Sequence, residues 1–516
     1  MQGLELTIFL SGTMKDLREE RTAIRTQIGS PLYEVVAAED WGARYRPPRD
    51  LCIRAVRESD VYLGLYGGRY GWKPPGDEIS VTEWEFNTAR EAGKPVLVYI
   101  RQGRKGPKQR AFLARVSDFN AGYNRRPEFE SCEQLVSWVK EDLVTLMEDL
   151  VEESENNGSA TRDPLIYVKC RLNLAFLARE DGQWEQAEHH YQWILNQGVW
   201  NETAHDLALH ELQILYVARK LWEEAIEVIW RSIDLLPLMG LPADDLRGRE
   251  ESLLQELAQT YILWARSDSD LGNLDGAVDA YKEAERIYQR IGDWESLREI
   301  RFALAETYER WAKMRISVRQ LADAVRHYQS ALELYEELER PARIALIWYR
   351  LGQLRKEQRR EREALNCFEK SLMYRKDNNH EFLVPYEIVL SAHDEIVQAR
   401  LKRRELHHAV SQLCEKADDL INIGLAQNAV VTAQEALRLS DKIQDRKLIL
   451  ASRCRLGRAL EEGGRPEQAM YEYQMALDLA DVLGDEHVRY EIVDRLDRLR
   501  EELSRRYGGY EYTPTT

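Results

Sequence analysis

The sequence predicts a two-part fold, in which an N-terminal α/β domain with a parallel sheet is followed by an all-helical solenoid. Two observations support this prediction. Residues 1–150 alternate short β-rich apolar runs with helical patterns, which is typical of βαβ units. From Leu165 onward the strand signals vanish, and one pattern of small and aromatic residues recurs at a fixed spacing.

The first part contains an ordered series of predicted strands and helices. Strands are expected at residues 6–10, 34–38, 61–66 and 95–100, with a poorly marked fifth at 127–129. Helices are expected at residues 15–28, 49–58, 82–92 and 132–150. This order predicts a flavodoxin-like domain over residues 1–151. Residues 152–164 are polar, rich in small side chains and end in proline, so we expect a linker there.

Seven residue triplets recur in the second part, each with offsets of four and three along a helix. They are Ala187/Tyr191/Ile194, Ala225/Ile229/Ser232, Ala277/Tyr281/Ala284, Ala324/Tyr328/Ala331, Ala364/Phe368/Ser371, Ala429/Ala433/Ala436 and Ala469/Tyr473/Ala476. Small residues let two paired helices approach closely, and the aromatic ring fills the gap to the next pair. The spacing is that of tetratricopeptide repeats and predicts about seven helix pairs over residues 165–486.

Two further features of the helical part bear on the repeat count. Leu351 and Leu456 each lie thirteen residues before the first alanine of a triplet, and each is followed by glycine, which is also typical of these repeats. Residues 386–439 admit two helix registers, so the count stays open there. Residues 487–516 are predicted to form a charged amphipathic helix that caps the last pair, and a tail.

Composition excludes several classes of protein. The net charge is −17, so the surface as a whole repels phosphate backbones and nucleic-acid binding is not expected. The six cysteines form no CxxC pair and the histidines no HExxH motif, so neither a disulfide framework nor a metal site is expected. No basic and apolar leader is found, and no apolar run reaches about 18 residues, so we expect a cytoplasmic protein without membrane spans.

The loops after the first and third strands are the predicted ligand-binding loops, because ligands bind where strand order reverses in a doubly wound sheet. Their candidate binding residues are Ser11, Gly12, Thr13, Gly67, Gly68, Arg69 and Tyr70. The first loop offers hydroxyls and backbone N–H groups to an anion, or only a helix cap. The glycines of the second permit close ligand approach and its arginine can face phosphate, although an ordinary turn is the alternative.

Two glutamates on the helix predicted at 82–92 are the candidate catalytic residues. Glu85 lies in a stripe of apolar and small residues and should point inward near the strand ends, whereas Glu83 lies on a polar face. A carboxylate held in an apolar stripe is costly without a purpose, and its pKa is sensitive to its surroundings. Ser80 and Thr82 precede the two glutamates at capping-box spacing, so helix capping is the alternative for both.

Four ordered motifs in the first hundred residues resemble the domain-of-unknown-function family numbered four thousand and sixty-two. They are SGTMKDLREER at 11–21, AAEDWGAR at 37–44, ESDVYLGLYGGRYGW at 58–72 and ISVTEWEFNTAREAGKPVLVYI at 79–100. The family name implies no activity. Its relatives, however, are Toll/interleukin-receptor (TIR) domains and nucleoside deoxyribosyltransferases, to which this domain is similar.

The two relatives suggest a role for Glu85. Nucleoside deoxyribosyltransferases carry a helix of the form E-x-G-x-A-x-A-x-G-K-P, and the chain matches it at Glu85, Ala89, Gly93, Lys94 and Pro95, whereas Asn87 stands at the first glycine. TIR domains place a glutamate on the helix after the third strand, where it serves cleavage of the nicotinamide N-glycosidic bond of NAD. By this resemblance Glu85 is the counterpart. The usual TIR pattern S-x-W-C-x-x-E is absent, because the chain reads SVTEWE.

The resemblance therefore implies a signalling or defence-type effector. Its TIR-like module would cleave an N-glycosidic bond of NAD or a related nucleotide without a further cofactor, because a carboxylate can stabilise or trap an oxocarbenium ion. The repeat array would bind a protein partner. The alternative is a non-enzymatic adaptor, in which the α/β domain only self-associates or binds a nucleotide. The basic run at 101–110 is expected to be a solvated loop, with a phosphate or acidic-partner patch as the alternative.

Overall fold

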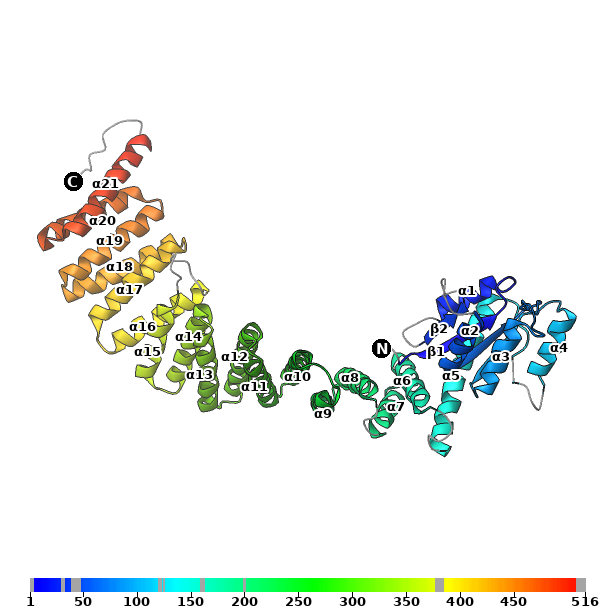
Figure 1. Ribbon diagram of the computed structural model, residues 1–516. Helices are drawn as coiled ribbons and strands as arrows, with labels where there is room; N and C mark the ends of the chain where they lie inside the picture. Colours follow the sequence, from blue (N-terminus) through cyan, green and yellow to red (C-terminus); the bar gives the residue numbers. More distant parts are fainter. Residues whose placement is uncertain are drawn as a thin grey trace. The chain divides into compact units, whose positions relative to one another are not determined.

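The computed structural model describes residues 4–28, 33–38, 48–118, 123, 126–157, 163–197, 201–375 and 385–506. It comprises two compact units, Met1–Thr260 and Tyr261–Thr516. The first unit contains the α/β domain and the first helix pairs, and the described elements of the second are all helices (Figure 1). Among the described helices, none is both long and apolar enough to cross a membrane.

Four parallel strands form the N-terminal sheet in the order β2-β1-β3-β4. They are β1 (Leu6–Gly12), β2 (Tyr33–Ala37), β3 (Val61–Tyr66) and β4 (Val96–Ile100). Strand β1 pairs with β2 on one edge and with β3 on the other, so the order reverses between β1 and β3 as predicted. The expected fifth strand is wrong as a strand, since only an isolated bridge joins Arg101 to Phe129.

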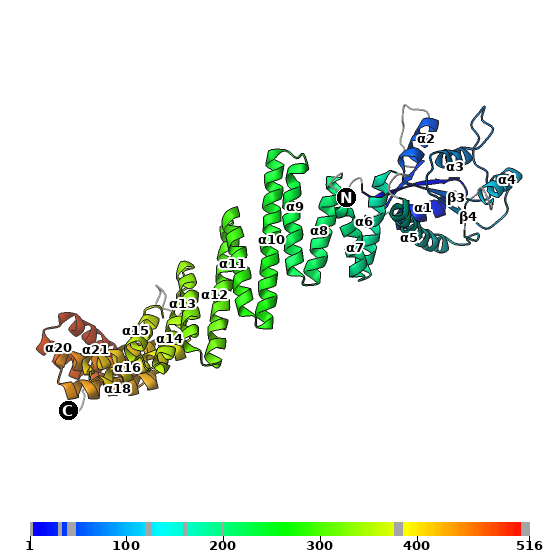
Figure 2. The same cartoon turned by 90° about the horizontal axis from the view of Figure 1, so that it is seen from below.

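Helices cover both faces of the sheet and make a three-layered domain. Helices α1 (Arg18–Gln27) and α5 (Cys132–Asn157) pack on one face. Helices α2 (Pro48–Glu58), α3 (Val81–Glu91) and α4 (Pro107–Val116) pack on the other (Figure 2). This arrangement confirms the predicted α/β fold class. It leaves the loops at the carboxyl ends of the strands available to form a site.

Helix α4 replaces the solvated loop that the sequence predicted within residues 101–110. Pro107 stands in the first turn of α4, where its missing N–H is not needed. The buried side chains of Phe112, Leu113 and Val116 follow at helical spacing and pack against the sheet. The basic residues of the run therefore lie partly in a loop and partly on the solvent side of a helix.

Helix α6 (Pro164–Glu180) is shared between the α/β domain and the repeats. Ile166, Tyr167, Cys170 and Leu174 on one side of it belong to the core beneath the sheet. Its other side packs with α7 (Trp184–Asn196) and α8 (Glu202–Ala218). Because α5 continues to Asn157, part of the predicted linker at 152–164 is helical. The predicted domain boundaries, 1–151 and 165–486, stay a prediction. The packing of α6 on both the sheet and α7 continues across the boundary between them.

The Lys169–Asp60 ion pair fixes α6 to the amino ends of β1 and β3. Lys169 Nζ lies 2.8 Å from Asp60 Oδ2, and both side chains are largely buried. The same carboxylate oxygen accepts hydrogen bonds from the Thr7 amide and hydroxyl, at 2.8 and 2.7 Å. The contact lies at the amino ends of the strands, and the loops of the predicted site lie at their carboxyl ends.

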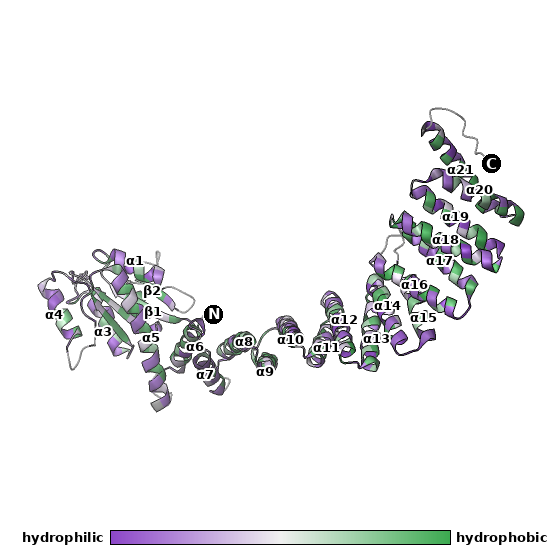
Figure 3. Cartoon of the chain, turned by 180° about the vertical axis from the view of Figure 1, so that it is seen from behind, coloured by the Kyte–Doolittle hydropathy of each residue, from purple (hydrophilic) through white to green (hydrophobic). Residues whose placement is uncertain are grey.

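The remaining described helices follow one another along the chain, and from α11 to α21 each packs against the next. They are α9 (Trp222–Leu235), α10 (Ala243–Leu271), α11 (Leu274–Ile291), α12 (Trp294–Ser317), α13 (Leu321–Glu337), α14 (Pro341–Glu357), α15 (Glu361–Met373), α16 (Tyr386–Lys402), α17 (Leu406–Asn422), α18 (Ala426–Ile443), α19 (Arg446–Glu462), α20 (Pro466–Leu483) and α21 (Glu486–Arg506). Most show both hydrophobic and hydrophilic residues along their length (Figure 3), as helices buried on one side require.

The predicted triplets form the contacts between the helices, and every residue of all seven triplets is buried. The glycines of the Leu-Gly pairs explain the close approach. A Cβ atom at Gly352 would lie 2.6 Å from the Phe368 ring, and one at Gly457 would lie 2.7 Å from the Tyr473 ring. The structure therefore confirms the tetratricopeptide-type fold predicted for the second part.

The ambiguous region 386–439 contains three consecutive helices, α16, α17 and α18. Helix α17 packs against both neighbours, and each turn contains a left-handed residue, Arg404 before α17 and Gly424 after it. Because both turns have the same form, the sequence admits both registers. Helix α18 carries the triplet beginning at Ala429, so α16 is an additional helix. Helix α21 covers α20 as a cap, and the predicted tail lies outside the described residues.

Candidate functional site

A cavity of about 730 Å³ lies beyond the carboxyl ends of β1 and β3. The loops after these strands form much of its wall, and α1, α2 and α3 also contribute to it. The structure brings together most of the predicted site residues here. Those that line the cavity are Gly12, Thr13, Gly68, Arg69, Tyr70 and Glu85.

Glu85 contributes the buried carboxylate of this cavity, with 6% of the residue exposed. The Ser11 hydroxyl donates a hydrogen bond of 2.6 Å to Glu85 Oε2. Ser80 caps α3 instead, because its hydroxyl accepts a hydrogen bond of 3.2 Å from the Glu83 amide. Glu85 therefore lies inward because it belongs to the apolar stripe of α3, and its side chain lines the cavity.

Glu83 lies apart from the cavity lining. Its carboxylate accepts a hydrogen bond from the Tyr70 hydroxyl and pairs with Arg115 of α4, although only 2% of the residue is exposed. Burial, followed by the hydrogen bond to Glu83, raises the pKa of Tyr70. Glu83 thus fixes the loop after β3 to α3 and α4, which is a positioning role.

The glycines of the two loops allow the backbone to approach closely. A Cβ atom at Gly12 would overlap the Leu65 carbonyl oxygen, and one at Gly68 would lie 2.7 Å from the Arg104 carbonyl oxygen. Gly67 does not line the cavity. Its carbonyl accepts a hydrogen bond of 3.1 Å from the Gln109 side chain, so it anchors the loop to α4.

Two buried members of the cavity wall were missed by sequence reasoning. Cys52 of α2 lies beside Glu85, and burial together with this carboxylate raises the pKa of its thiol to about 12. Arg21 of α1 is 2% exposed, and its Nη1 donates to the carbonyls of Leu10 and Gly12 at 3.3 Å each. Arg21 ends the motif at 11–21 but was not singled out within it, and Cys52 stands in no motif, because both reach the cavity only through packing of their helices on the sheet.

Two tyrosine hydroxyls lie close to the carboxylate beneath the cavity. The Tyr62 and Tyr66 hydroxyl oxygens are 3.2 Å apart on β3. Burial raises the pKa of both phenols, and the Glu85 carboxylate raises them further. Both are therefore neutral at physiological pH, so the surroundings of Glu85 contain hydroxyl dipoles rather than additional anions.

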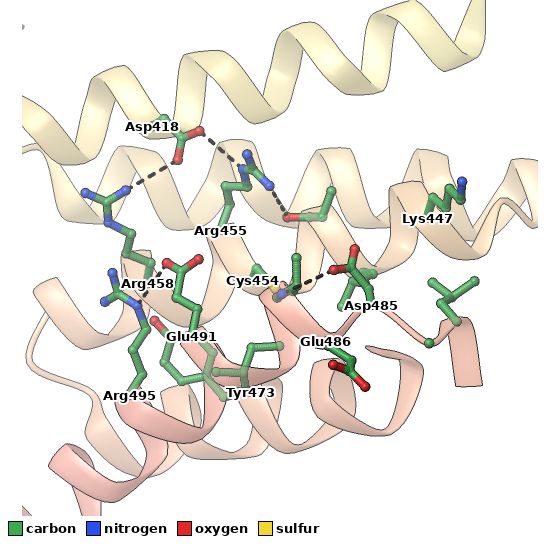
Figure 4. Close-up of a pocket in the computed structure, with 16 residues that line it drawn as sticks. Asp418, Lys447, Cys454, Arg455, Arg458, Tyr473, Asp485, Glu486, Glu491 and Arg495 are labelled. Carbon is green, nitrogen blue, oxygen red and sulfur yellow. Dashed lines mark hydrogen bonds and ion pairs between the residues drawn. The ribbon is translucent and has the colours of Figure 1, made fainter. Parts of the chain in front are cut away.

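A second cavity, of about 600 Å³, lies in the unit Tyr261–Thr516 between helices α17, α19, α20 and α21. Figure 4 shows Arg455 and Arg458 directed toward Asp418. Arg495 Nη1 lies 3.0 Å from Glu461 Oε2. Burial raises the pKa of the Cys454 thiol at this cavity to about 11. The three arginines that line this groove are thus each paired with a carboxylate.

No cluster of three or more His, Cys, Asp or Glu residues suited to a metal ion occurs in the part of the chain that the structure describes. All six cysteines are free thiols. The fold and the cavity define a protein with an α/β domain, which has a cavity beyond the carboxyl ends of its strands, joined to a tetratricopeptide-type array. Residues 7–144 match the family model described as Domain of unknown function (DUF4062), which confirms the resemblance drawn from the motifs.

Solved structures similar to this chain are helical repeat proteins. BtubC from P. vanneervenii is 17% identical over 57% of this chain and 95% of its own, with a TM-score of 0.20. A Rap protein complexed with Competence and Sporulation Factor is 16% identical over 66% and 98%, with a TM-score of 0.19. The repeat assignment rests on the buried triplets, because these scores are low. No curated protein matches the chain.

Proposed function

We propose that the α/β domain cleaves an N-glycosidic bond of NAD or a related nucleotide, and that a protein partner bound by the repeat array controls it in signalling or defence. The observation that supports this proposal is the buried Glu85 carboxylate in a cavity beyond β1 and β3, held by the Ser11 hydroxyl. A buried carboxylate of this kind is costly, and such groups cluster at functional sites.

The chemistry requires only this carboxylate and water. As the bond between the anomeric carbon and the base nitrogen breaks, its electron pair leaves with the base and positive charge develops on the sugar. The carboxylate of Glu85 stabilises that charge or forms an ester with the anomeric carbon, and water then releases the sugar and restores the carboxylate. Ser11 would orient Glu85 throughout.

The repeat array is proposed to bind protein. Stacked helix pairs present a continuous surface, and the groove between α17, α19 and α21 offers arginine and carboxylate groups beside apolar side chains. This assignment does not depend on catalysis by the α/β domain.

NAD consumption by the purified full chain tests the catalytic proposal, measured alone and with conditions that promote oligomers. Glu85→Gln keeps the shape but removes the charge, and should lower the rate by roughly a thousandfold. Glu91→Gln lies on the same helix with an exposed side chain and should retain full activity. If the unchanged chain is as inert as Glu85→Gln toward NAD, nucleotides and nucleosides, the adaptor hypothesis replaces the enzymatic one.

A further inference from the structure

Lys15 and Arg69 come from different loops but line the same cavity. Asp16 brings them together, because its Oδ2 accepts a hydrogen bond of 3.2 Å from the Arg69 amide. The other carboxylate oxygen bonds to the Thr13 hydroxyl. The loop after β1 and the loop after β3 are therefore connected through one side chain, with a cation on each.

The charges of these two cations have no ionic partner among the residues that the structure describes. Both side chains are exposed, and no described residue forms an ion pair with either. Two other cations near these loops are paired, since Arg101 Nη1 lies 2.9 Å from Glu20 and Lys105 Nζ lies 2.7 Å from Glu128. The cavity thus has one rim with two unpaired positive charges, while its carboxylate, Glu85, is buried.

We propose that Lys15 and Arg69 bind a phosphate group of the ligand, so that the cavity selects nucleoside phosphates over nucleosides. Arginine offers parallel N–H donors to two phosphate oxygens, and lysine adds a mobile point charge. Asp16 is a positioning residue, since it aligns the two loops without contacting the phosphate. This inference rests on the proposed function of the same cavity, and it names the chemical group that determines the choice of ligand.

Calorimetric binding to the full chain tests the selection, with AMP and UMP compared with adenosine and uridine. At least one monophosphate should bind more than tenfold more tightly than its nucleoside. Lys15→Ala and Arg69→Ala should each weaken monophosphate binding by about fivefold and leave nucleoside binding unchanged. Arg110→Ala removes an exposed arginine that does not line the cavity, and should change neither.

Asp16→Ala separates the positioning role from the charge. It retains both cations but releases the Arg69 amide and the Thr13 hydroxyl, so the preference for monophosphate should fall although the net charge of the loops becomes more positive. The affinity for monophosphate should also fall as salt rises, whereas nucleoside affinity should not.

Equal affinities for monophosphates and nucleosides would overturn the inference, and so would the absence of binding by any of them at about 1 mM. Failure of the proposed reaction gives a different result, because binding is measured without turnover. A chain that prefers monophosphates but consumes neither them nor NAD would remove the catalytic proposal and leave the phosphate site.

Discussion

The two cavities of this protein differ in whether their basic side chains form ion pairs. In the repeat array, Arg455 and Arg458 share the carboxylate of Asp418, so both arginines have an ionic partner within the groove. In the α/β domain, Lys15 and Arg69 line the same cavity as the buried Glu85, and neither forms an ion pair with a described residue.

By our proposal, this difference distinguishes a groove whose arginines pair within the fold from a cavity whose two cations bind a ligand. Paired charges at a partly exposed surface contribute modestly to stability, and a partner must compete with the existing pairs. A cation without an ionic partner does not stabilise the fold. Its desolvation costs little free energy only where the cation stays in contact with water or binds an anion. Four predictions test this distinction and the helix that joins the two regions.

The largest effect on stability should come from removing α6, because this helix completes the core beneath the sheet of the α/β domain. A fragment of residues 1–157 lacks Ile166, Tyr167 and Leu174, which are buried against the sheet. We expect it to be less stable than fragment 1–238 by roughly 5 kcal/mol, or not to fold. Urea denaturation followed by circular dichroism measures this. Equal stability would show that the predicted linker divides two independent domains.

Packing in the array should respond next. Gly352→Ala places a methyl group 2.6 Å from the buried Phe368 ring, so despite the gain in helix propensity it should lower the free energy of unfolding by about 2 kcal/mol. Gly248→Ala in α10 meets no atom within 4 Å and should raise stability by about 0.5 kcal/mol. If both substitutions raise the free energy of unfolding, the helices of a pair do not approach as closely as described at Gly352.

The α6–α7 pair should give a pH-dependent effect. Burial, then Arg171, lowers the pKa of His190 to about 4. Above pH 6.5 the histidine is neutral in both states. Between about 6.5 and 4 only the unfolded chain takes up the proton, so stability should fall by about 1–2 kcal/mol after allowance for solvent screening. His190→Gln should remove this slope, and His189→Gln, which is exposed, should keep it. An unchanged slope in His190→Gln would contradict the assignment.

The smallest effect addresses the charges directly. Asp418→Ala leaves Arg455 and Arg458 without their shared carboxylate and should lower the free energy of unfolding by about 1 kcal/mol. Arg69→Ala should leave it within about 0.5 kcal/mol, because the side chain is exposed. Thermal or urea denaturation of the full chain compares them. The reverse ranking would mean that the two cavities do not differ as described.

Local pattern predicted much of the fold. The strand over residues 61–66 was placed with its observed limits because all of its residues are buried, which gives a continuous apolar run. The triplets were recognised because each helix pair repeats the same contacts at the same spacing. Helix α4 was missed because Lys108 and Arg110 dominate the run, while Phe112 and the other buried residues follow only after it.

The site was predictable where it follows strand ends and not where it depends on packing. Gly12, Arg69 and Glu85 could be placed because the order of parallel strands fixes which loops meet. Arg21 and Cys52 belong to helices whose rotation about their axes is set by the whole core. The pairing of the Asp16 side chain with the Arg69 amide depends on the geometry of both loops, which the sequence does not specify.

Hydrogen–deuterium exchange of the intact chain, with and without AMP, tests most directly whether the cavity beyond β1 and β3 is the nucleotide site. Slower exchange is expected at residues 12–17 and 68–72, where the two loops surround the cavity, with no change at residues 447–495. Protection confined to 447–495, or absent from both segments at saturating AMP, would contradict this assignment.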